Sequence, residues 1–112
     1  MSNKNKIRTR IEEEYIIIKS IVNQLTLVDP NIENIPVISG KDNYTIAKKI
    51  IVINVKDDDD NYLDNNELIY KLIYLYVFTF CDEHVHPKKW NNIFENLLQK
   101  AIELKLYKLP NK

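Results

Sequence analysis

Glycine and cysteine are almost missing from this chain of 112 residues, which contains one of each. The single cysteine, Cys81, cannot form a disulfide within the chain, so the sequence is not a disulfide-stapled secreted domain and suits a reducing compartment. The chain also lacks a net charge, because its 16 basic and 16 acidic residues cancel. The molecule as a whole therefore has no electrostatic attraction to nucleic acid or anionic lipid.

A long hydrophobic run is also missing. The longest apolar stretch, residues 68–81, is interrupted by Lys71 and is shorter than the roughly 20 residues that a membrane span needs. The first residues, MSNKNKIRTRIEEE, lack the apolar core of a secretory signal. The composition that remains, 45% hydrophobic and 29% charged, is typical of globular proteins. We therefore expect one soluble intracellular domain over residues 1–112.

The hydrophobic pattern predicts an α+β fold in which three helices pack on a small antiparallel sheet. A first helix is expected over residues 8–26, where apolar side chains recur at three-and-four spacing: Ile11, Tyr15, Ile18, Val22 and Leu25. Three runs rich in β-branched residues predict short strands at 35–39, 44–46 and 50–55.

Two further helices are expected in the second half of the chain. A capping sequence at 64–67 begins a helix over 66–82, which is apolar on nearly every face and therefore central. Pro87 separates it from an amphipathic helix over 88–106, and Pro110 is expected to end the fold. The acidic loop before them, residues 56–61, lacks the glycine and terminal glutamate of an EF-hand, so we assign no metal to it.

Residues 66–107 resemble the WLM and SprT-like zinc metallopeptidases. The resemblance rests on the helix NELIYKLIYLYVFTFC, the segment CDEHVH and the amphipathic WNNIFENLLQKAIELKLY. The preceding YTIAKKIIVINVKDDDDNYLDNN is similar to the strand and loop before that family's active-site helix. The resemblance is to small members from large DNA viruses and protists, and it implies a zincin-like domain, plausibly of viral origin.

The chemistry of that family is missing from its expected positions. The two histidines of His-Glu-x-x-His fall on Tyr74 and Phe78, the catalytic glutamate falls on Leu75, and only His86 falls on a ligand position. A zincin needs two imidazoles on one helix face to hold zinc, and a glutamate as general base. The phenol of Tyr74, with an ordinary pKa of about 10, is a poor substitute ligand. The resemblance implies an inactive relative without metal or cofactor, in which bulky side chains fill the former cleft.

Three functions follow as hypotheses. The first is a catalytically inactive protein-binding or structural module, in the infected host cell or the virion, with no small-molecule substrate and no membrane partner. Its contacts would come from a protein partner or from self-association through the apolar surface of helices 66–82 and 88–106. Tyrosine is favoured at such interfaces, and the candidates are Tyr62, Tyr70, Tyr76 and Tyr107.

The second hypothesis is a metal-dependent hydrolase with a noncanonical site, and the third is a nucleic-acid-associated accessory domain. A noncanonical site would be assembled from the only cluster of potential ligands, Cys81, Asp82, Glu83, His84 and His86. The absence of a ligand pair at i and i+4 argues against it. The nucleic-acid role follows from the resemblance alone, and the neutral net charge argues against it.

Overall fold

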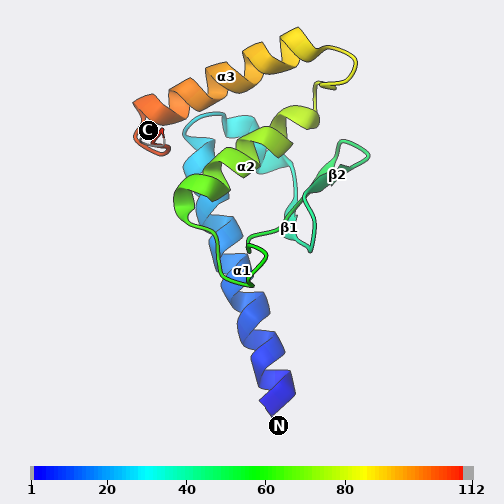
Figure 1. Cartoon of the computed structure of the whole chain (residues 1–112), viewed down its shortest axis with the longest axis vertical. Helices are drawn as coiled ribbons and strands as arrows, with labels where there is room; N and C mark the ends of the chain where they lie inside the picture. Colours follow the sequence, from blue (N-terminus) through cyan, green and yellow to red (C-terminus); the bar gives the residue numbers. More distant parts are fainter. Residues whose placement is uncertain (1, 110–112) are drawn as a thin grey trace.

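The computed structural model describes the backbone of residues 2–109 and the side chains of residues 9–109. Along this part of the chain the order of elements is α1 (Ser2–Thr26), η1 (Pro30–Asn34), β1 (Val37–Ser39), β2 (Tyr44–Ile46), β3 (Ile50–Ile53), α2 (Asn65–Phe78) and α3 (Pro87–Glu103). α2 lies between the sheet and α3, while α1 runs along β1 and α2 (Figure 1). The prediction of an α+β domain with three α-helices and a small sheet is confirmed.

The helix boundaries differ from the expected ones. α1 begins at Ser2 instead of residue 8, and α2 ends at Phe78 instead of residue 82. The hydroxyl of Thr79 donates to the backbone oxygen of Tyr76 at 2.6 Å, and the chain turns out of the helix there. Asp64 caps the start of α2 as expected, accepting from the Glu67 amide at 2.8 Å. Pro110 lies outside the described residues.

The sheet is mixed, so the expectation of a wholly antiparallel sheet is wrong for one strand. Its order is β1-β3-β2, with β1 parallel to β3 and β2 antiparallel to β3. The connection between the parallel strands β1 and β3 contains β2, because β2 comes between them in the chain. The crossover passes close to the sheet at Gly40, where an added Cβ would overlap the Cγ1 of Val52. This close approach explains why glycine is needed there.

The hairpin between β2 and β3 turns without glycine. Ala47 and Lys48 both have positive φ angles, 52° and 60°, and the Lys49 amide donates to the Ile46 carbonyl at 2.9 Å. Two successive residues of this conformation form the hairpin turn that matches the twist of a sheet.

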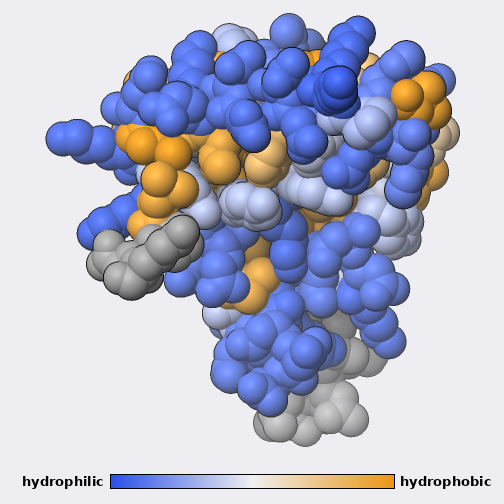
Figure 2. Space-filling view, turned by 45° about the horizontal axis from the view of Figure 1, so that its top comes forward, coloured by the Kyte–Doolittle hydropathy of each residue, from blue (hydrophilic) through white to orange (hydrophobic). Residues whose placement is uncertain are grey.

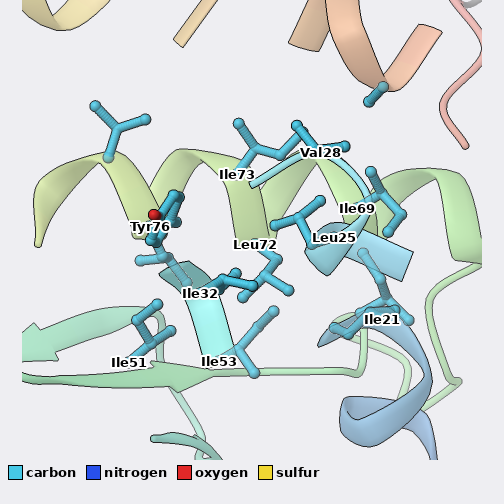
Figure 3. Close-up of a cluster of buried hydrophobic side chains, with 14 of the residues drawn as sticks. Ile21, Leu25, Val28, Ile32, Ile51, Ile53, Ile69, Leu72, Ile73 and Tyr76 are labelled. Carbon is cyan, nitrogen blue, oxygen red and sulfur yellow. The ribbon is translucent and has the colours of Figure 1, made fainter. Parts of the chain in front are cut away.

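The core lies between the sheet, α1 and α2. Ile51 and Ile53 point from β3 toward α2 (Figure 3). The side chains that meet them there are buried: Ile21, Leu25, Ile32, Ile69, Leu72 and Ile73. Residues alternate along a strand, so the row Ile38, Val52 and Tyr44 faces the opposite side. Ile38 and Tyr44 are exposed there, whereas Val52 between them is buried, so only the outer strands of this face are open to solvent.

Among the described residues, no helix combines the length and the apolar character needed to cross a membrane.

Candidate functional site

Tyr74 and Phe78, to which the resemblance assigns the two histidines of a zincin, lie on one face of α2. Their ring centroids are 5.2 Å apart. Trp90 of α3 covers both, with centroid distances of 4.8 Å to Tyr74 and 5.3 Å to Phe78, and stacks on Phe94 at 5.1 Å. Aromatic pairs at these separations are favourable contacts. Aromatic rings therefore fill the space between Tyr74, Phe78 and α3.

His86 does not enter this packing. Its side chain is exposed, and the residue occupies the position before Pro87 at the start of α3 without a side-chain cap hydrogen bond. Its backbone fixes the turn, since its amide donates to the Asp82 carbonyl at 2.8 Å and its carbonyl accepts from the Trp90 amide at 2.9 Å. His86, which the resemblance places at a ligand position, therefore serves the chain reversal between α2 and α3.

The cluster from Cys81 to His86 is dispersed in space. Cys81 is buried and His84 is exposed, while Asp82 accepts from the His84 amide at 2.9 Å. Nowhere between residues 9 and 109 do three side chains of His, Cys, Asp or Glu converge on a position that could hold a metal ion. The noncanonical metal site considered above therefore has no assembled ligand set in the described part of the chain.

Tyr74 is held as a phenol. Burial raises its pKa above the usual 10, and the nearby Glu83 carboxylate adds to this effect. The hydroxyl donates to Oε1 of Glu83 at 3.2 Å, which also favours the protonated form. The side chain is thus further from a metal-binding phenolate at neutral pH than an unperturbed tyrosine.

A groove lies beside this aromatic packing, over α2. It is a pocket of about 700 Å³. Side chains on one face of α2 form its floor, at the three-and-four spacing of neighbouring helical residues. Its lining consists of Asn43, Asn66, Glu67, Tyr70, Lys71, Tyr74, Leu75 and Tyr107. Tyr74 and Leu75, to which the resemblance assigns a ligand and the base, therefore line a hollow. The filling of a former catalytic cleft by bulky side chains stays a prediction.

The C-terminal segment forms one wall of the groove. The side-chain amide of Asn66 donates to the Lys108 carbonyl at 2.8 Å and accepts from the Lys108 amide at 2.7 Å. This paired contact fixes Tyr107 beside Tyr70, with ring centroids 5.9 Å apart. Tyr70 also makes an edge contact with Phe94 at 5.2 Å. The rings of Tyr70 and Tyr107 are thus held in place by contacts within the chain.

A polar network forms the opposite wall. The Lys71 ammonium donates to the backbone carbonyl of Asn54 at 2.9 Å. The backbone amide of Asn54 donates to the side-chain oxygen of Asn43 at 2.7 Å. The Asn54 side chain donates in turn to the Lys41 carbonyl at 2.9 Å. Burial lowers the pKa of Lys71, an effect that the Glu67 carboxylate opposes. These contacts anchor the loop before β2 against α2.

Sequence reasoning identified part of this site. Of the four tyrosines named as candidate contact residues, Tyr70 and Tyr107 line this pocket, whereas Tyr62 and the buried Tyr76 do not. Asn43, Asn66 and Lys71 were not foreseen. Asn43 comes to α2 only when the loop before β2 folds against the helix, a contact that no local pattern marks. Figure 2 shows hydrophobic and weakly polar side chains gathered beneath the hydrophilic upper surface, where α3 covers the rest of the molecule.

The fold and the groove define a small α+β domain whose central helix carries an aromatic pocket. The chain is similar to a viral protein, Uncharacterized protein 136R of Invertebrate iridescent virus 6, with 39% identity over 71 residues. The alignment covers 61% of this chain and 40% of that protein, so the chain spans less than half of its relative's length. No family model and no solved structure matches. A viral relative thus supports the viral part of the resemblance, and the zincin part stays a prediction.

Proposed function

We propose that this chain is a noncatalytic protein-binding module, derived from a zincin-like metallopeptidase, whose binding surface is the groove over α2. The proposal includes the loss of hydrolysis, because the positions of the ligands and the base carry Tyr74, Leu75 and Phe78. A fold that has lost its catalytic groups keeps a shaped surface, and binding is the role that such a surface retains.

One observation carries the proposal: three tyrosines, Tyr70, Tyr74 and Tyr107, converge on one pocket. Tyrosine supplies a large apolar face and a polar tip, and it is enriched among the residues that dominate binding energy at protein interfaces. Ring contacts and the Asn66–Lys108 hydrogen bonds hold Tyr70 and Tyr107 in place. A preorganised surface loses little side-chain entropy on binding.

The charges of the groove disfavour a polyanion as its ligand, because Glu67 and Lys71 place charges of both signs along the floor. The side-chain amide of Asn66 already pairs with the backbone of Lys108, and the Asn43 side chain accepts from the Asn54 backbone amide. Apolar ring contact with the tyrosines is therefore the main attraction that the groove offers. The partner we expect is a peptide segment with an aromatic or aliphatic anchor.

The test uses peptides selected from a displayed library against the full chain. Tyr70→Ala is expected to weaken the selected peptides by at least tenfold, since losing one central aromatic contact typically costs about 2 kcal/mol. Tyr44→Ala is the matched control, because Tyr44 is 49% exposed and Tyr70 is 41% exposed, but Tyr44 lies on the outer sheet face. Affinities measured by fluorescence anisotropy decide the matter. An equal loss of affinity in both variants, or no loss in Tyr70→Ala, would show that the peptide does not bind in the groove over α2.

A further inference from the structure

Lys71 places a half-buried positive charge in the groove over α2. Its ammonium donates to the backbone carbonyl of Asn54 at 2.9 Å, in a contact that is itself partly buried. This bond uses one of the three N–H groups of the ammonium. Burial lowers the pKa of Lys71, because it disfavours the charged form. Among residues 9–109, no carboxylate forms an ion pair with this cation.

The groove around Lys71 is aromatic and apolar. Tyr74 and Leu75 lie one helical turn beyond Lys71, at i+3 and i+4, and Tyr70 precedes it directly in the chain. Side chains three and four apart on a helix are neighbours, with about 5–6 Å between their Cβ atoms. Charges attract each other more strongly beside apolar groups than in water, since the effective dielectric constant is lower there. An anionic group is therefore bound more strongly at Lys71 than at a lysine on an open surface.

Glu67, the acidic residue of the groove, lies nearer to solvent than Lys71. It precedes Lys71 by four residues, in the first turn of α2, and its side chain is exposed. Water and salt screen an exposed charge, and the start of a helix stabilises an acidic side chain. A single carboxylate can thus pair with Lys71, whereas a second negative charge one turn toward the start of α2 would meet Glu67.

The C-terminal residue of a peptide combines the two features that this part of the groove complements. Its carboxylate and its side chain leave the same Cα atom, so the carboxylate can reach Lys71 while the side chain contacts Tyr74 and Leu75. In an extended peptide, neighbouring side chains point to opposite faces. The carboxylate of an internal aspartate or glutamate therefore points away from the side chain beside it, which makes it a poorer match to one floor.

We propose that the groove over α2 binds the C-terminal residue of its peptide partner, with the α-carboxylate paired to the Lys71 ammonium and an apolar side chain against Tyr74 and Leu75. This inference rests on the proposed function, because it specifies which part of a peptide the groove takes. The hydrogen bond to Asn54 holds the ammonium in place, so little side-chain entropy is lost when the carboxylate binds.

Hexapeptides with a fluorescent label on the N-terminus test the carboxylate contact. They end in phenylalanine, tyrosine, leucine or isoleucine, and each is made as the free acid and as the carboxamide. Fluorescence anisotropy with the full chain is expected to show at least about tenfold tighter binding of the free acid, because hydrogen bonds between charged groups are the stronger ones. Equal affinity for the two forms would overturn the inference. So would an amidated peptide ending in aspartate that binds as tightly as the free acids.

The contribution of Lys71 is tested with a matched pair of variants. Lys71→Met keeps an unbranched apolar side chain and is expected to abolish the preference for the free acid. Lys89→Met is the control, because Lys89 is exposed on α3 and does not line the groove. Glu67→Gln is expected to strengthen binding of the free acid, since it removes the negative charge of the groove. A preference that survives Lys71→Met would contradict the pairing, and the comparison of acid with amide on the wild type holds whether or not the variants fold.

Tyr70→Ala separates this inference from the proposed function. Peptides that bind equally well as acid and amide, but lose affinity in Tyr70→Ala, would retain the peptide-binding groove and reject the carboxylate contact. Peptides that bind the wild type and Tyr70→Ala equally, or that bind neither, would reject the proposed function and this inference with it.

Discussion

At the scale of residues, the resemblance assigns the zincin ligand and base positions to Tyr74, Leu75 and Phe78, and the structure shows what these side chains touch. Tyr74 and Phe78 meet Trp90, a contact that an amphipathic last helix made foreseeable. Leu75 is buried yet lines the groove. The groove could not be foreseen, because its openness depends on where Asn43 and Tyr107 lie, and both are distant from α2 in sequence.

Tyr62 and Glu13 give a residue-level test of how α1 docks on the body. The Tyr62 hydroxyl donates to the Glu13 carboxylate at 2.6 Å, and this hydrogen bond is the main cause that raises the pKa of Tyr62 to about 12. Because the pKa of Tyr62 is higher in the folded than in the unfolded protein, the protonated hydroxyl stabilises the folded state below pH 10. This contribution is lost as the pH rises from about 10 toward 12.

The expected result is that Glu13→Gln lowers the pKa of Tyr62 toward its usual value and removes this alkaline loss of stability. NMR titration of the tyrosine ring carbons resolves Tyr62 from the other tyrosines. A Tyr62 that titrates identically in the two proteins would show that α1 does not dock at this point.

At the scale of elements, helices were predicted better than strand pairing. The apolar periodicity fixed the existence of α1, α2 and α3, because burial repeats along each helix. Their ends were less certain: nothing in the run VFTFC marks Phe78 as the last helical residue, and the turn there depends on the Thr79 hydroxyl. The parallel pairing of β1 with β3 was missed, because alternation within a strand carries no information on its neighbour.

The hairpin between β2 and β3 gives the element-level prediction. Ala47 and Lys48 hold positive φ angles, which cost residues with a Cβ roughly 1 kcal/mol each. The double substitution Ala47→Asn and Lys48→Gly supplies the residues that this turn prefers. We expect it to raise the free energy of unfolding by about 1 kcal/mol, measured by chemical denaturation.

The control is Lys49→Gly at the next position, which is not among the residues with positive φ. Glycine there only adds freedom to the unfolded chain, so it is expected to destabilise the protein. A double variant that is no more stable than the wild type would show that the turn conformation is not strained.

At the scale of the whole molecule, two surfaces account for the features that packing alone does not require. Three tyrosines line the groove over α2, and the N-terminal half of α1 exposes Ile11, Tyr15 and Ile16. They lie at different parts of the molecule.

The central claim is that α2 is a zincin helix whose ligand positions have been replaced. Zinc titration by calorimetry tests it most directly, on the wild type, on Tyr74→His combined with Phe78→His, and on that double variant with His86→Ala. Restored imidazoles at i and i+4 lie on one helix face and need a third ligand. We predict no stoichiometric zinc in the wild type, one zinc in the double variant, and its loss with His86→Ala. One zinc bound by the wild type through His86, or none by the double variant, would contradict the account.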